Sequence, residues 1–239
     1  MLEDYFSLQL KFAEHYATAA DVPFEIAIAH CTNLRRRLNL WGHAGVTRWN
    51  DFLAQVSRSA NDHSAALSMC IELYETRPSL EVERSFGCFS YDAPDAAGAL
   101  RIHFIPPEDM RASPLASAST GARVDELRAL FSHVRRTERN VASVRGVSWL
   151  YNLDAYKRLF PPLYAASVKA PWFPVHLNGS STWGQVLNWR QEVKPAVRDA
   201  VLARLARLAT MKIEAPREVF TEQALRATRG IGGFYELLV

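Results

Sequence analysis

The order of patterns in residues 99–160 limits the fold of this chain more than any other feature. Ala99–Ile105 is a short apolar run typical of a strand, and a loop rich in serine and alanine follows it up to Gly121. An amphipathic pattern then predicts a helix over Arg123–Arg139, and Ser143–Tyr151 predicts another strand. A small-residue loop that leads from a strand into a helix can hold an anion with backbone N–H groups and the helix dipole. The order therefore suggests a ligand that carries phosphate.

The first 77 residues have a purely helical pattern. Apolar side chains recur every three or four positions, which predicts helices over Leu2–Thr18, Phe24–Leu38, Thr47–Arg58 and Asp62–Thr76. We expect these helices to form an N-terminal layer.

Strand patterns begin after residue 78. Phe86–Tyr91 and Ala99–Ile105 flank a turn-rich segment, which predicts a hairpin. Pro195–Met211 predicts a long helix, and the tail Gly230–Val239 predicts a last strand. We therefore expect a single α+β domain over residues 1–239. In it, a helical N-terminal layer (1–77) packs on a small mixed sheet, and residues 78–239 form a mixed α/β core with C-terminal helices.

Composition excludes several classes of protein. With 239 residues, 49% hydrophobic and 22% charged, the chain is long enough and apolar enough to bury a core rather than stay disordered. Its three cysteines form no Cys-x-x-Cys pair, which argues against a disulfide framework and a structural zinc site. The N-terminus is acidic where a signal peptide is basic, and no apolar run reaches the roughly 18 residues of a membrane span. We expect a cytoplasmic protein without a membrane segment.

The loop before the Arg123–Arg139 helix is the candidate ligand site. Backbone N–H groups of Ser119, Thr120, Gly121, Ala122 and Arg123 can point at a phosphate or pyrophosphate, and the Arg123 guanidinium adds charge. An ordinary flexible connection is the alternative, because serine, alanine and glycine are common in loops. Neither a Gly-Lys-Ser nor a Gly-x-Gly-x-x-Gly motif is present, so the usual nucleotide signatures are absent.

The order of elements over residues 86–160 resembles the GNAT fold of acyl-CoA N-acyltransferases. Gly121 opens the helix as a glycine of that family's pyrophosphate loop does, although Ala118–Arg123 keeps only one of its glycines. Asn152 followed by Ala155 is similar to the family's Asn-x-x-Ala after its fifth strand, whereas Tyr156 is out of register with the family's tyrosine. The resemblance implies a GNAT-like core, acyl-CoA as cofactor, and Asn152 among the cofactor-binding residues.

The resemblance also implies a base at the end of the strand before the loop, which would deprotonate an amine. His103, Glu108 and Asp109 are in that position, and imidazole titrates near neutrality. A histidine on an apolar strand can equally be a core or edge residue. His103 and His176 lack a third metal ligand in the sequence, so we expect no metal.

A non-catalytic binding protein is the second hypothesis. Of the 28 Lys and Arg residues only five are lysine, and arginines 128, 135, 136 and 139 share the outer face of one predicted helix. Such arginine-rich faces suit an acidic protein or nucleic-acid partner, whereas a net charge of +3 is too low to favour nucleic acid. The sequence leaves the acceptor, the acyl group and the oligomeric state open.

Overall fold

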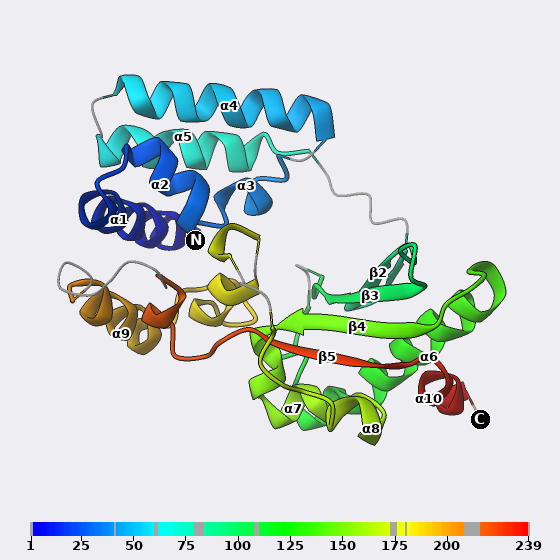
Figure 1. Ribbon diagram of the computed structural model, residues 1–239. Helices are drawn as coiled ribbons and strands as arrows, with labels where there is room; N and C mark the ends of the chain where they lie inside the picture. Colours follow the sequence, from blue (N-terminus) through cyan, green and yellow to red (C-terminus); the bar gives the residue numbers. More distant parts are fainter. Residues whose placement is uncertain are drawn as a thin grey trace. The chain divides into compact units, whose positions relative to one another are not determined.

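The computed structural model describes residues 2–40, 42–59, 62–78, 84–107, 110–172, 176–179, 181–207 and 216–238 (Figure 1). The chain forms two compact units, one from residues 1–80 and 174–223 and the other from residues 81–173 and 224–239. The predicted α+β class is confirmed, because the second unit is a mixed sheet with helices packed on it. The helical layer expected at residues 1–77 belongs to the first unit, which also takes in residues 174–223. The single domain over 1–239 stays a prediction.

The first unit, here called the helical unit, is built from α-helices and short 3-10 turns. Its helices are α1 (Glu3–Ala20), α2 (Phe24–Cys31), α3 (Leu34–Arg37), α4 (Gly42–Arg58), α5 (His63–Glu75) and α9 (Pro195–Leu205). Its 3-10 turns include η3 (Leu177–Gly179), η4 (Ser181–Val186) and η6 (Pro216–Val219).

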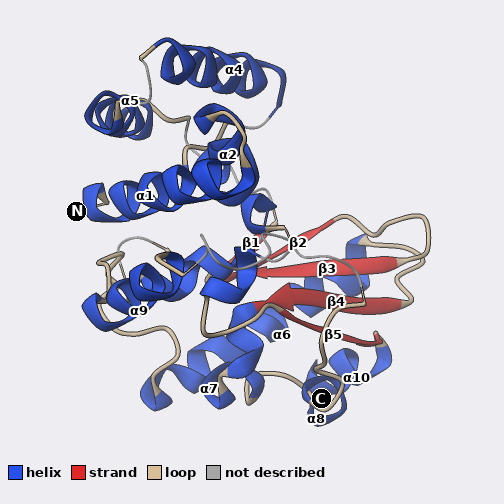
Figure 2. Cartoon of the chain, turned by 60° about the vertical axis from the view of Figure 1, so that its left-hand side comes forward, coloured by secondary structure: helices blue, strands red, loops and turns tan. Residues whose placement is uncertain are grey.

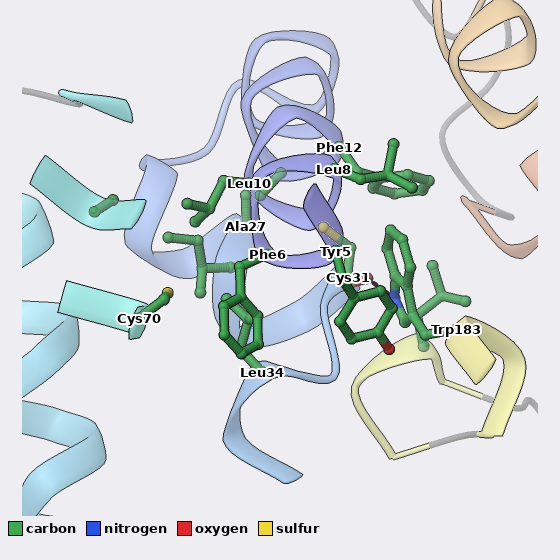
Figure 3. Close-up of a cluster of buried hydrophobic side chains, with 14 of the residues drawn as sticks. Tyr5, Phe6, Leu8, Leu10, Phe12, Ala27, Cys31, Leu34, Cys70 and Trp183 are labelled. Atoms are coloured by element: carbon green, nitrogen blue, oxygen red, sulfur yellow. Dashed lines mark hydrogen bonds between the residues drawn. The ribbon is translucent and has the colours of Figure 1, made fainter. Parts of the chain in front are cut away.

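Trp183 lies at the centre of the core of the helical unit (Figure 3). Its ring contacts Tyr5 and Phe12 edge to face, and its Nε1–H donates to the Cys31 carbonyl at 2.9 Å. The indole is fully buried, so this hydrogen bond avoids the cost of an unpaired N–H in an apolar core. A residue distant in sequence therefore completes the core that α1 and α2 begin.

The helix predicted over Phe24–Leu38 is divided into α2 and α3, which corrects that expectation. The Asn33 N–H donates to Gln9 Oε1 at 2.8 Å, and Tyr5 Oη donates to Asn33 Oδ1 at 3.0 Å. The buried Gln9 side chain of α1 thus accepts the Asn33 N–H in place of a helical carbonyl, and Tyr5 holds the Asn33 side chain. In addition, α4 begins at Gly42, earlier than the expected Thr47.

The second unit, here called the sheet unit, contains a sheet in the order β1-β2-β3-β4-β5. The strands are β1 (Ser85–Phe86), β2 (Phe89–Asp92), β3 (Ala99–Phe104), β4 (Ser143–Ser148) and β5 (Leu225–Gly230). Only β3 and β4 are parallel among these neighbours, and α6 (Thr120–Thr137) connects them. The remaining elements are η1 (Ser117–Ser119), η2 (Trp149–Asn152), α7 (Asp154–Lys157), α8 (Pro162–Ala165), α10 (Gly232–Tyr235) and η7 (Glu236–Leu238).

Two expected strands differ from the structure. The run Phe86–Tyr91 is a hairpin of β1 and β2, because Gly87 adopts a positive φ of 61° that turns the chain. The final strand ends at Gly230, where the expected strand begins, and the described residues 232–238 that follow are helical. The predicted hairpin of the second and third strands is confirmed.

The two faces of the sheet differ in polarity. Leu100, Ile102, Val144 and Ala227 are buried against α6 and the short helices, which lie on one side of the sheet (Figures 1 and 2). Because side chains alternate along a strand, the intervening residues Arg101, His103, Arg145 and Thr228 lie on the opposite face. We call this second surface the polar face.

No helix among the described residues is long and apolar enough to cross a membrane. The Cys31 and Cys70 thiols are free and buried.

Tyr151, Tyr156 and Tyr164 form a buried cluster beneath β4. The Tyr151 and Tyr164 hydroxyls are 2.7 Å apart, and burial raises the pKa of Tyr151 well above its ordinary value. The cluster fits only because Gly146 of β4 has no side chain. A Cβ at Gly146 would lie 2.1 Å from Tyr151 Oη and 2.9 Å from Tyr164 Oη.

We therefore expect Gly146→Ala to lower the free energy of unfolding by about 3 kcal/mol, because the added methyl group overpacks the tyrosine cluster. Urea unfolding followed by circular dichroism measures the change. Gly232→Ala is the matched control, since a Cβ there meets no atom within 4 Å, and its stability should stay within about 0.5 kcal/mol of the parent. Equal stability of the two variants would contradict the packing described for β4.

Candidate functional site

The parallel pairing of β3 and β4 is short. The two strands pair in register only at Ala99–Ser143, Leu100–Val144 and Arg101–Arg145. Beyond this point β3 continues to pair with β2 as far as Phe104, and β4 continues to pair with β5 as far as Ser148. The β3–β4 pairing therefore ends before the carboxyl ends of the two strands, the end of a parallel sheet at which ligands commonly bind.

The start of α6 is held by its own loop. Ser119 Oγ donates to the Ser113 carbonyl at 2.9 Å, and the Ser119 and Thr120 N–H groups donate to carbonyls of Ala116 and Ser117. The Ser119 hydroxyl is therefore already bonded within the loop.

Gly121 and Ala122 are the exposed residues of the first turn of α6. Their N–H groups are among those that have no acceptor four residues back inside the helix. A Cβ at Gly121 would meet no atom within 4 Å, so the space in front of this turn is open. An anion can approach these two N–H groups.

Arg123, which we expected to add charge at the candidate site, is buried. It is 7% exposed, and its Nη2 donates to Glu126 Oε1 at 2.5 Å. Its buried Nε and Nη1 have no hydrogen-bond partner among the described residues. Glu126 Oε2 in turn accepts the Cys88 N–H at 3.0 Å, which ties α6 to the turn between β1 and β2. Burial and the nearby Glu126 carboxylate raise the pKa of Cys88 to about 11.

His103 lies on the polar face, near the end of β3. Its Nε2 is 2.9 Å from Oδ1 of Asp92 on β2, and its side chain is 19% exposed. An ionised carboxylate only accepts hydrogen bonds, so in the neutral imidazole Nε2 carries the hydrogen and Nδ1 carries the lone pair. The pair has the arrangement of a histidine base that an acid orients. The other expected bases, Glu108 and Asp109, lie outside the described residues.

Asn152 lies in η2, after the end of β4. Its Nδ2 donates to the Trp149 carbonyl at 2.6 Å, so the amide stabilises its own turn. Tyr156 is 2% exposed in the tyrosine cluster and presents no hydroxyl to solvent. Along the chain, the loop before α6 follows the end of β3, and Asn152 follows the end of β4.

Sequence reasoning missed Asp92 and Glu126. Asp92 lies two positions along β2 from the partner of His103, a diagonal neighbour that becomes visible only once the hairpin register is known. Glu126 lies three residues after Arg123, a spacing that allows an ion pair on one helix. That spacing was the available signal.

Other candidate groups do not gather at this site. Among the described residues, no three His, Cys, Asp or Glu side chains converge on one point that could hold a metal ion. On α6, Arg128 bonds the Leu237 carbonyl and Asp125, and Arg135 lies 5.5 Å from the centre of the Tyr235 ring. Two of the outer arginines thus already contact the C-terminal segment.

No family model, no curated protein sequence and no solved structure matches this chain.

We expect Glu126→Ala to lower the free energy of unfolding by about 2 kcal/mol, because it leaves the buried Arg123 guanidinium and the Cys88 N–H without their acceptor. Chemical denaturation measures this loss. Asp125→Ala removes a carboxylate from the exposed Arg128 pair on the same helix and should change stability by less than about 0.5 kcal/mol. A loss in the control as large as in Glu126→Ala would show that helix charge, not the buried pair, is responsible.

Proposed function

We propose that this chain is an acyl-CoA-dependent N-acyltransferase that holds the pyrophosphate of CoA at the start of α6. The observation that carries the proposal is the early end of the β3–β4 pairing, toward the end of β3 from which the loop to α6 departs. In this proposal, an elongated ligand lies between the carboxyl ends of β3 and β4, where the two strands no longer pair with each other.

The backbone on both sides of this gap is suited to the arm of CoA. β3 pairs with β2 and β4 pairs with β5 on their outer sides, so the inner edges of 102–104 and 146–148 face the gap. The arm of CoA contains amide groups, which hydrogen-bond to strand edges as a peptide does. The main chain of Val147–Tyr151 would then orient the thioester.

The groups at the start of α6 are suited to the pyrophosphate. Gly121 and Ala122 are exposed residues at the positive end of an 18-residue helix, where N–H groups have no acceptor within the helix. Arg123 supplies a buried positive charge whose Nε and Nη1 have no partner among the described atoms. An anion would provide acceptors that the protein itself does not.

His103 is the base in this proposal, and Asp92 positions it. His103 takes the proton of the amine, directly or through water, as the amine nitrogen bonds to the thioester carbonyl. The carbon–sulfur bond breaks, the leaving thiolate of CoA takes the proton from His103, and the acyl group becomes an amide. Glu108 stays the second candidate base. The amine itself is of unknown identity.

A non-catalytic binding protein is the second candidate, and the polar face favours it. Arg101 lies beside Arg145 in register, and Arg145 forms an ion pair with Asp95 at 2.9 Å. Arg226 is on the same face, and its buried Nε has no partner within the described part of the chain. Neighbouring arginines of this kind would attract an acidic partner.

We expect Gly121→Asp to abolish the rise in melting temperature that acetyl-CoA gives, because the new carboxylate repels the pyrophosphate. The fold should be unharmed, since the position is open and an acidic residue is favourable in a first helical turn. Gly121→Ala is the control and should keep CoA binding, because it adds a methyl group without charge.

The same thermal-shift assay separates the two candidate functions. In addition to acetyl-CoA, the assay measures the melting temperature with longer acyl-CoAs, ATP and oligonucleotides. No shift with any CoA species would contradict the acyltransferase proposal. A salt-sensitive shift with oligonucleotides alone would favour the binding protein.

We expect His103→Gln to lower kcat about 100-fold or more with little change in CoA affinity, because it removes the base but not the phosphate contacts. Release of the CoA thiol from acetyl-CoA, with a panel of amines, measures turnover. His15→Gln removes an exposed histidine of α1 and serves as the control. Full activity of His103→Gln would show that another group takes the proton.

A further inference from the structure

Ser7, His63 and Glu14 form a continuous line of hydrogen bonds in the helical unit. Ser7 and Glu14 lie on α1, and His63 is the first residue of α5, which packs beside α1 (Figure 1). His63 Nδ1 is 2.7 Å from Glu14 Oε1, and His63 Nε2 is 3.2 Å from Ser7 Oγ. Both distances are within the range in which a base contacts a nucleophile and an orienting acid.

The spacing along α1 explains how one imidazole reaches both residues. Ser7 and Glu14 are seven positions apart, which is about two turns, so their side chains lie on the same face of the helix. The rise between them is about 10 Å at 1.5 Å per residue. An imidazole bonded through both nitrogens bridges that separation.

The acid fixes which nitrogen of His63 is the base. An ionised carboxylate only accepts hydrogen bonds, so Glu14 requires the neutral imidazole to carry its hydrogen on Nδ1. The lone pair then lies on Nε2 and faces the Ser7 hydroxyl. Ser7 therefore donates to His63, which is the direction of proton transfer that activates a serine.

Ser7 also lacks the bond that helical hydroxyls in this chain usually make. Six hydroxyls on or next to helices donate to the carbonyl four residues earlier: those of Thr18, Thr32, Thr47, Ser68, Thr76 and Thr137. Within the described residues, the one hydrogen bond of the Ser7 hydroxyl is to His63. The hydroxyl is thus directed away from its own helix and toward a base.

The three side chains are reachable from solvent. The His63 and Glu14 side chains are 27% and 34% exposed, and Ser7 is partly buried. A small acyl group can therefore reach the Ser7 hydroxyl, while Glu14 stays beside the imidazole.

We propose that Ser7 is a nucleophile that His63 activates and Glu14 positions, and that this second site hydrolyses activated esters of small carboxylic acids. The inference is independent of the acyltransferase proposal, because all three residues belong to the helical unit.

The reaction runs in two balanced halves. Ser7 Oγ bonds to the ester carbonyl carbon and gives its proton to His63 Nε2. The bond to the leaving alcohol breaks, and that alcohol takes the proton from Nε2. Water then attacks the acyl-serine with His63 as base, which releases the carboxylic acid and restores the Ser7 hydroxyl.

A fluorophosphonate probe tests the proposal on the full chain. It reacts with activated serines, forming a bond from Oγ to phosphorus and releasing fluoride. We expect peptide mass spectrometry to find the adduct on Ser7 of the folded protein and not of protein denatured in urea. Absence of an adduct on Ser7, or equal labelling after denaturation, would overturn the proposal.

Variants then test the roles of the two partners. We expect His63→Gln to slow Ser7 labelling and p-nitrophenyl acetate hydrolysis at least 100-fold, and Glu14→Gln about tenfold or more, with Glu14→Asp recovering part of that loss. Ser68→Ala is the control, because that hydroxyl of α5 bonds its own helix and its loss should leave both rates unchanged. Circular dichroism checks that each variant is folded at the assay temperature. An unchanged labelling rate in folded His63→Gln would show that the line of bonds only joins α1 to α5.

Discussion

The arrangement of the sheet unit depends on how β3 and β4 are each held by an outer neighbour. The parallel pairing of β3 with β4 ends at Arg101 and Arg145. Beyond these residues β3 continues to pair with β2, and β4 continues to pair with β5. On the buried side, the Phe104 ring packs edge to face on Tyr156, with ring centres 5.3 Å apart. Aromatic packing therefore fills the space below the sheet, whereas the facing backbone edges of β3 and β4 beyond Arg101 and Arg145 are not paired with each other in the described sheet. An additional hydrogen-bonded pair here would extend the parallel part of the sheet.

Patterns in short stretches of the sequence were sufficient to predict much of the fold. The alternation in Ala99–Phe104 and the apolar stripe of α6 gave the strand, helix and α+β class, because each depends on residues near one another in sequence. The break at Asn33 was missed because its hydrogen-bond partners Tyr5 and Gln9 belong to another helix. The same limit applies to the hairpin at Gly87, where a backbone conformation rather than a hydrophobic pattern ends the strand.

At the candidate site, the sequence did not indicate the contacts that Arg123 and Asn152 make. Arg123 lies four residues before Leu127, on the buried stripe of α6, so its side chain points toward Glu126 and the β1–β2 turn. The expectation that Arg123 adds charge at the loop did not take account of the side of the helix on which Arg123 lies. Asn152 bonds its own turn for a comparable reason, since η2 begins directly after β4 and brings Trp149 within reach.

The two candidate sites each contain a histidine beside a carboxylate, but opposite nitrogens face the acid. In His103 it is Nε2 that contacts Asp92, which leaves the lone pair on Nδ1, close to the backbone of the strand. In His63 it is Nδ1 that contacts Glu14, which leaves the lone pair on the outer nitrogen, where it meets a hydroxyl of the protein. The first arrangement suits proton removal from a ligand held by the main chain, and the second suits activation of a side chain. Because the two pairs belong to different units and share no residue, loss of one base should leave the geometry of the other unchanged.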